Sequence, residues 1–216
     1  MSDFLINVGL ILTYIMIGVA ALAAVIYPLM FLAKNPSKGK TALMGVGGLL
    51  LIAVVYVGYM ILFPVSPKAE AGVEAYSLSL QVEYHRPYKK GRLIFGEEKD
   101  GALVPFGKYW RTGANANTTF ETNKDILFGD QELAAGKYGL YTFPNEDIWG
   151  VALSSKNDVF FAVSQPDKKT TVLKTSVKPK NLKPEVEQFT IDFSQDSTGI
   201  SLNLKWDKTM VSIPIE

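Results

Sequence analysis

The chain of 216 residues carries 22 basic and 21 acidic side chains, so its formal net charge at pH 7 is +1. Hydrophobic residues make up 48% of it and its mean hydropathy is +0.13, which does not describe a water-soluble globule over the whole length. With no cysteine and a single histidine, the sequence excludes a thiol nucleophile and a histidine-rich zinc site.

Two long uncharged runs fill the first part of the chain. They extend over residues 4–33 and 41–63, and each is long enough for the roughly 20 apolar residues that cross a bilayer core. We therefore predict a transmembrane helical hairpin over residues 1–65. A cleavable signal peptide is the alternative, because Ala21, Leu22 and Ala23 match the small-residue cleavage pattern. The basic residues that begin such a peptide are missing, however, and a second run follows.

The loop between the two runs sets the expected orientation. Lys34, Lys38 and Lys40 lie in loop 34–40, whereas no lysine or arginine precedes the first run. Cytoplasmic loops of membrane proteins carry an excess of basic residues. Loop 34–40 is therefore expected in the cytoplasm, and both termini are expected in the periplasm.

Small residues form a candidate packing surface on the two predicted helices. Ala20 and Ala24 are four residues apart in the first run, and Gly45, Gly47 and Gly48 are grouped in the second. Small side chains allow helix backbones to approach closely in lipid. Two interpretations stay open: the two helices pack on each other, or a helix of another integral membrane protein docks there.

The remainder of the chain has the pattern of a β-protein. Prolines and small polar residues predict a linker over residues 66–74, and a periplasmic all-β domain is expected over residues 75–216. Hydrophobic residues alternate strictly in residues 76–84 and 200–206. Shorter strand signals follow the same rule, at residues 118–122, 126–129, 137–143, 149–153, 159–163, 171–177 and 188–193. Such a series predicts a β-sandwich or a partly closed barrel.

Charge and motif content narrow the function of this domain. Setting aside Asp3 and the three lysines of loop 34–40 leaves 19 basic and 20 acidic residues, without the basic stripe expected for a nucleic-acid partner. A Ser/His/Asp triad would have to use His85, and no serine lies in a G-x-S-x-G turn. We predict no catalytic residue, no metal site and no cofactor.

Three arginines are concentrated in one part of the domain, and every other basic residue is a lysine. The planar guanidinium suits bidentate, partly buried pairing. One interpretation is that each arginine ties neighbouring loops through carboxylates or backbone carbonyls. The other is a pocket for an anion or polar ligand, formed by His85, Arg86, Arg92, Trp110, Arg111 and Asn115. Separately, two interpretations are open for Ser197 in the stretch "DST", which lies in an expected hairpin turn: a plain polar turn, or a site of O-glycosylation.

Three stretches resemble a known family: "YHRPYKKGRLIFG", "LVPFGKYWRTGANANTTFETNKDILFGDQELAAGKYGLYTFP" and "LNLKWDKTMVSIPI". They are similar to the bacterial domain-of-unknown-function family DUF2911, and the resemblance covers about residues 66–216. It implies an exported, β-rich domain and supplies no activity, substrate or catalytic residue. The membrane hairpin is an addition to the family pattern.

Two classes of function compete. In the first, the chain is a non-catalytic accessory subunit of a bacterial inner-membrane complex, for example a proton-driven motor of the ExbB/ExbD type or a respiratory complex. Its partners are then the lipid bilayer and integral membrane protein subunits. In the second, it is a membrane-tethered ligand-binding module or a hydrolase for an envelope glycan or peptide. The predicted helices lack ionisable groups, which argues against an ion path through this chain.

Overall fold

The computed structural model of the protein describes residues 30, 45–50, 52–53, 66–75, 77–157, 159, 162–197 and 199–216. The chain divides into two compact units, Met1–Pro64 and Val65–Glu216, and each is considered by itself. Most of the predicted spans 4–33 and 41–63, together with loop 34–40, Ala20 and Ala24, lies outside the described residues. Within the described part of the chain, no helix combines the length and the hydropathy that a bilayer crossing requires.

The described helical residues of the first unit expose large apolar side chains. Residues 45–50 and 52–53 are helical, and the exposed fractions of Leu49, Leu50 and Ile52 are 69%, 52% and 66%. At Gly45, Gly47 and Gly48 an added Cβ would have no described atom within 4 Å beyond the helix's own backbone. No described residue therefore covers the helix surface at the three glycines.

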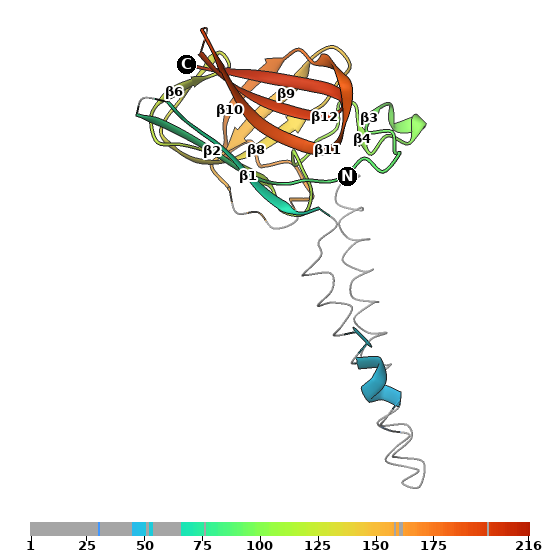
Figure 1. The fold of residues 1–216 in the computed structure, drawn as a ribbon. Coiled ribbons are helices and arrows are strands. Elements are labelled where there is room, and N and C mark those ends of the chain that lie inside the picture. Colours follow the sequence, from blue (N-terminus) through green and yellow to red (C-terminus); the bar gives the residue numbers. More distant parts are fainter. Residues whose placement is uncertain are drawn as a thin grey trace. The chain divides into compact units, whose positions relative to one another are not determined.

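The second unit is built of strands, which confirms the predicted all-β domain (Figure 1). Its larger sheet has the order β1-β2-β5-β8-β9-β10, and all neighbours are antiparallel. The strands of this sheet are β1 (Lys68–Ala75), β2 (Leu78–His85), β5 (Thr118–Thr122), β8 (Gly136–Phe143), β9 (Trp149–Ser154) and β10 (Thr171–Val177).

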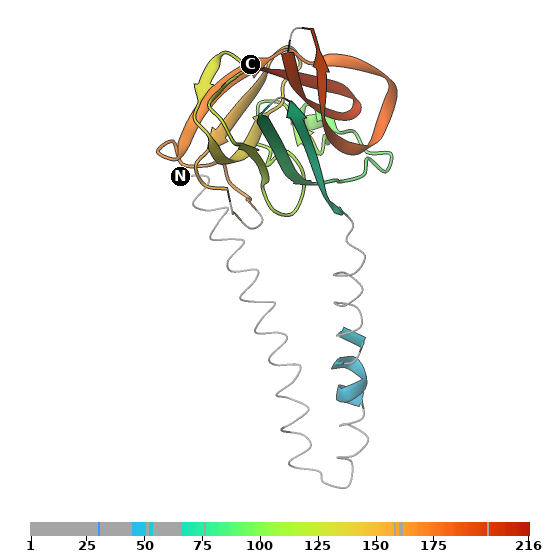
Figure 2. The ribbon, with the colours of Figure 1, turned by 60° about the vertical axis from the view of Figure 1, so that its left-hand side comes forward.

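A second sheet has the order β11-β12-β6-β7. It is formed by β11 (Lys180–Asp196), β12 (Gly199–Ile215), β6 (Ile126–Phe128) and β7 (Gln131–Leu133). The short parallel pair β3 (Phe95–Gly96) and β4 (Val104–Pro105) flanks the 3₁₀ turn η2 (Glu98–Asp100). The long β11–β12 hairpin lies over the larger sheet (Figures 1 and 2), and β1 contacts β11 while β10 contacts β7 and β12. The two sheets thus share one core.

Alternation of hydrophobic residues places the core side chains as predicted. Leu80, Val82 and Tyr84 of β2 are buried, and so are the four predicted residues of β12, namely Ile200, Leu202, Leu204 and Trp206. Because successive strand residues point to opposite faces, each strand gives one side to this core. The aromatic part of the core gathers where β12 and β11 meet the loop before β5, and Trp110 and Trp206 stack there with centroids 5.8 Å apart.

The predicted linker over residues 66–74 is wrong for most of its length. Residues Lys68–Ala75 form the edge strand β1, which pairs with β2 from Lys68 opposite His85 to Ala75 opposite Leu78. The small side chains Ala69, Ala71 and Val73 pack against the core, while the charged residues between them face solvent. An edge strand with alanines at its inward positions has the composition of a linker, and the sequence pattern alone did not separate the two.

The strand predicted at residues 159–163 is also wrong for its described members. Val159, Ala162 and Val163 lie outside any strand, whereas residues 160 and 161 are outside the described residues. The side chain of Asn117 accepts a hydrogen bond from the Val159 amide at 2.9 Å, and the Tyr109 hydroxyl donates to the Ala162 carbonyl at 3.0 Å. The Asn117 amide also donates to the Val159 carbonyl at 3.3 Å. Isolated side-chain and backbone hydrogen bonds therefore take the place of a sheet ladder among the described residues of this segment.

Candidate functional site

The loop from Trp110 to Asn117, between β4 and β5, is fixed to the sheet by Trp110. The Trp110 amide donates to the Thr142 carbonyl at 2.9 Å, and the Thr142 amide donates back at 3.0 Å. The indole nitrogen of Trp110 donates to the carbonyl of Gly113 at 3.0 Å. Only 7% of Trp110 is exposed, and its ring packs on Phe189 with centroids 4.9 Å apart. Trp110 is thus a core residue that also holds the loop after it.

The backbone of this loop is strained. Thr112 has φ of 56° and Asn115 has φ of 59°, in the left-handed region that L-residues other than asparagine and glycine rarely adopt. Thr112 is fully buried, and its carbonyl accepts a 2.6 Å hydrogen bond from the Thr118 hydroxyl. Such positions cost on the order of 1–3 kcal/mol each and are frequent at functional sites. The core contacts of this loop hold a conformation that local preferences disfavour.

A cavity of about 360 Å³ opens beside this loop, and we call it the arginine pocket. It brings together Arg92, Trp110, Arg111 and Asn115, four of the six residues predicted from the sequence to form a ligand site. Its other lining residues come from the start of the domain, the β2–β3 connection, β4 with the residue before it, the same loop, and β12. They are Ser66, Pro87, Tyr88, Lys90, Leu103, Val104, Gly113, Ala114 and Trp206.

Only some of the N–H donors of the pocket's guanidinium groups donate hydrogen bonds to described residues. Arg111 donates from Nη1 to the carbonyl of Asn115 at 2.9 Å. Arg92 donates from Nε to the carbonyl of Lys89 at 2.9 Å and from Nη2 to that of Tyr88. These bonds stay within each residue's own loop, and no described carboxylate pairs with either group. Since a guanidinium has five N–H donors, most of those on Arg111 have no partner among the described residues.

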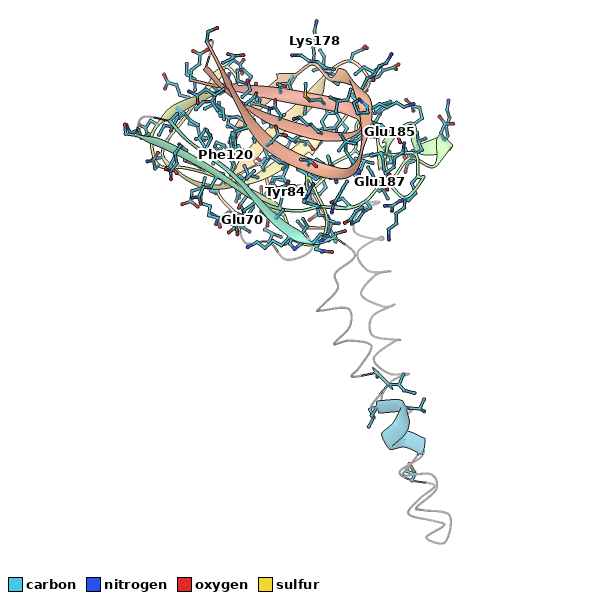
Figure 3. All side chains as sticks on the ribbon, viewed as in Figure 1. Glu70, Tyr84, Phe120, Lys178, Glu185 and Glu187 are labelled. Atoms are coloured by element: carbon cyan, nitrogen blue, oxygen red, sulfur yellow. The ribbon has the colours of Figure 1, made fainter. Side chains whose placement is uncertain are left out.

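All charged residues of the described lining carry positive charge. Lys90, Arg92 and Arg111 are basic, and no lining residue is acidic. The adjacent Lys89 differs, because its ammonium group pairs with Asp207 at 2.8 Å and with Glu185 at 3.1 Å. Glu185 and its neighbour Glu187 lie on β11 (Figure 3), where Glu187 accepts a hydrogen bond from the backbone amide of Lys90 at 2.8 Å. These acids position the segment that carries Lys90 without lining the pocket.

Arg86 does not line the arginine pocket. Its Nε donates to the Phe189 carbonyl at 3.1 Å and its Nη2 to the Thr190 hydroxyl at 2.8 Å. It thereby joins the residue after β2 to β11 across the two sheets. The interpretation of arginine as a tie between distant segments therefore fits Arg86, through a carbonyl and a hydroxyl.

His85 lines a separate cavity of about 240 Å³ with Lys68, Glu83 and Asn117. Burial lowers the pKa of its imidazole below the usual value, and the positive charge of Lys68 lowers it further. Its buried Nδ1 has no hydrogen-bond partner among the described residues. On the other side, Gly113 lies so close to His85 that an added Cβ would come within 2.9 Å of the His85 carbonyl. The backbone of His85 therefore packs closely against Gly113 of the loop.

Several lining residues had no signal in the sequence. Ser66 belongs to the predicted linker, and the sequence does not distinguish Lys90 from the other lysines. Trp206 belongs to the alternating pattern of residues 200–206, which predicts an inward side chain and no site. They meet at the pocket because β12, the start of the domain and the β2–β3 connection border the same cavity. In the described part of the chain, no group of three or more His, Cys, Asp or Glu residues is placed to hold a metal ion.

The second unit is thus an all-β domain with a cavity that is lined by basic and aromatic side chains. The model of a family described as "Protein of unknown function (DUF2911)" matches residues 66–215, and the chain belongs to that family. Neither the comparison with curated proteins nor the comparison with solved structures gave a match.

Proposed function

We propose that the protein is a membrane-tethered binding module of the bacterial inner membrane, whose β-domain holds a ligand with an anionic group in the arginine pocket. The observation that carries this proposal is the set of unused guanidinium donors on Arg111, beside Arg92 and Lys90, in a lining without described carboxylates. Arginine forks bind carboxylate and phosphate groups through paired hydrogen bonds. The tether in this proposal is the helical hairpin expected over residues 1–65, with the β-domain in the periplasm.

The lining favours binding over catalysis. Neither a histidine nor a carboxylate is among the described residues around the pocket, so this lining lacks the groups most often used for general acid–base chemistry. Trp110 and Trp206 are buried at the inner end of the pocket, and Leu103 and Tyr88 add exposed apolar surface. Ligand sites commonly combine apolar surface with a few polar groups. Asn115 and Ser66 add hydrogen-bonding groups at one wall.

A thermal-shift assay tests the proposal. The full-length protein in a non-ionic detergent is heated with phosphate, sulfate, citrate or acetate. A ligand at about 100 times its Kd adds about 2.7 kcal/mol of stability, which raises Tm by about 5 to 10 °C for a chain of this size. We expect such a rise with at least one anion, and its loss in Arg111→Gln. Lys178→Gln is the matched control, since Lys178 is exposed and does not line the pocket. Equal shifts in Arg111→Gln and wild type would contradict the proposal.

A second candidate function is an accessory subunit that docks on partner helices through the hairpin. Two observations favour it: no described residue covers Gly45, Gly47 and Gly48, and Leu49 and Ile52 are exposed. Small-residue faces let another helix approach closely. The test is to replace Gly45 and Gly48 by leucine and to measure which membrane proteins co-purify from the native host. Recovery should fall with the β-domain intact, and undiminished recovery would exclude this docking face.

A further inference from the structure

The β-domain begins at the wall of the arginine pocket. Ser66 lines the pocket, and its carbonyl accepts a hydrogen bond from the Asn115 side chain at 3.3 Å. The next carbonyl, of Pro67, accepts one from the Arg86 amide at 2.9 Å. The residues before β1 are therefore fixed to the loop that carries Arg111, so the point where the chain enters the domain is held beside the pocket.

The connection between the proposed tether and the pocket wall is short in the sequence. The second apolar run ends at Phe63, so only residues 64 and 65 separate it from Ser66. A tether of residues 41–63 in a bilayer, as proposed above, would keep the protein at a membrane surface, where lipid headgroups supply phosphate groups.

The chemistry of the pocket fits a ligand with a charged head and an apolar body. Lys90, Arg92 and Arg111 supply the positive charge, while Leu103 and Tyr88 line the same pocket with 44% and 37% of their surface exposed. Tyrosine is enriched at membrane interfaces, where its ring and hydroxyl meet both environments. Guanidinium groups match the geometry of phosphate oxygens, and basic residues near a bilayer are attracted to anionic lipids.

We infer that the anionic group held in the arginine pocket is the phosphate of an anionic membrane lipid headgroup, an inference that rests on the proposed function. A free phosphate or a soluble phosphate ester shares the same chemistry. A lipid differs from these by adding apolar contacts at Leu103 and Tyr88. Its headgroup is also supplied at high local concentration by the bilayer in which the chain is tethered.

Tryptophan fluorescence of the full-length protein in a non-ionic detergent tests the inference. All three tryptophans of the chain lie in the β-domain, and two of them, Trp110 and Trp206, line the pocket. The protein is titrated in separate arms with dihexanoyl phosphatidylglycerol, dihexanoyl phosphatidylcholine, inorganic phosphate and citrate. We expect a saturable change with phosphatidylglycerol, at least tenfold weaker apparent binding of phosphatidylcholine and of inorganic phosphate, and unchanged behaviour in Lys178→Gln.

Two variants connect the signal to the pocket. Arg111→Gln should weaken phosphatidylglycerol binding at least tenfold. Arg111→Lys should retain part of the binding, because lysine keeps the positive charge but lacks the paired N–H donors of the guanidinium. Circular dichroism of both variants checks that the domain stays folded. Binding of inorganic phosphate or citrate as tight as that of phosphatidylglycerol would overturn the lipid inference and leave the anion site standing. If no ligand of the four changes the fluorescence, both the lipid inference and the anion site are overturned. A phosphatidylglycerol response that is unchanged in Arg111→Gln and Arg111→Lys would also overturn both.

Discussion

The side-chain amide of Asn115 donates a hydrogen bond to the carbonyl of Ser66 at 3.3 Å, and so connects the Arg111 loop to the start of the β-domain. The carbonyl of the same Asn115 accepts the Arg111 guanidinium at 2.9 Å. One residue therefore orients the cation and anchors the entering chain. Asn115 adopts a positive φ of 59°, which asparagine tolerates better than most residues. The position of Arg111 thus depends on a local backbone conformation.

Gly113→Ala should destabilise the domain by about 2 to 4 kcal/mol, because it combines backbone strain with a collision. Gly113 has φ of 152°, and an added Cβ would lie 2.9 Å from the His85 carbonyl, a backbone atom that cannot turn away. Gly107→Ala is the control, since its φ of 71° imposes strain in open space. Thermal unfolding of both variants checks this, and equal losses would show that the His85 contact has no effect.

Replacing Arg86 by alanine should destabilise the domain more than replacing Arg111 by alanine. Arg86→Ala removes two charge-assisted hydrogen bonds between the residue after β2 and β11, and about 1.5 to 3 kcal/mol of stability should be lost. Arg111→Ala removes one bond within a loop at a half-exposed position, and less than about 1 kcal/mol should be lost. Denaturant unfolding of the two variants measures the difference. A larger loss for Arg111→Ala would assign it a structural role and weaken the case for a binding residue.

The domain should become less stable as the pH falls through about 6.5, partly because of His85. Burial and Lys68 lower the pKa of His85 below its unfolded value of 6.5. The unfolded chain then binds a proton before the folded one, so stability is complete above pH 6.5 and is lost as the pH falls from there toward the lowered pKa. Tm measured from about pH 5.5 to 7.5 should vary less in His85→Gln. Parallel curves for the two proteins would show that another group is responsible.

Ser197 should carry a glycan in the native host. It is exposed at the turn that connects β11 to β12, where a sugar can project without displacing the core. Intact-mass measurement of the protein from its host should show added mass, and Ser197→Ala should remove it. The bare polypeptide mass in the wild type would rule the modification out.

The sequence predicted the parts of the fold that depend on local pattern. Alternation identified the buried faces of β2 and β12, since the side-chain period of two is a property of each strand alone. It missed β1, whose inward alanines are too small to give a hydrophobic signal. It also predicted a strand near Val159, which hydrogen-bonds to the side chain and the amide of Asn117 and belongs to no strand of the described chain.

The candidate site was predictable to the extent that its residues are close in sequence. Trp110, Arg111 and Asn115 belong to one loop, and Arg92 precedes them by a short segment. The interpretation of arginine as a tie describes Arg86, which bonds to β11, whereas Arg111 lines a cavity and its role in ligand binding stays a prediction. Ser66 and Trp206 joined the site through tertiary packing, which no local pattern encodes. Similarly, the separation of His85 from the pocket follows from the position of Gly113 between them.

Native mass spectrometry of the full-length protein, extracted from its host in a mild detergent, tests the central claim most directly. The account predicts a non-covalent adduct on the wild type and on Lys178→Gln that is absent from Arg111→Gln, because the ligand depends on the guanidinium in the pocket. An adduct of the same mass and occupancy on Arg111→Gln, or no adduct on the wild type, would contradict it.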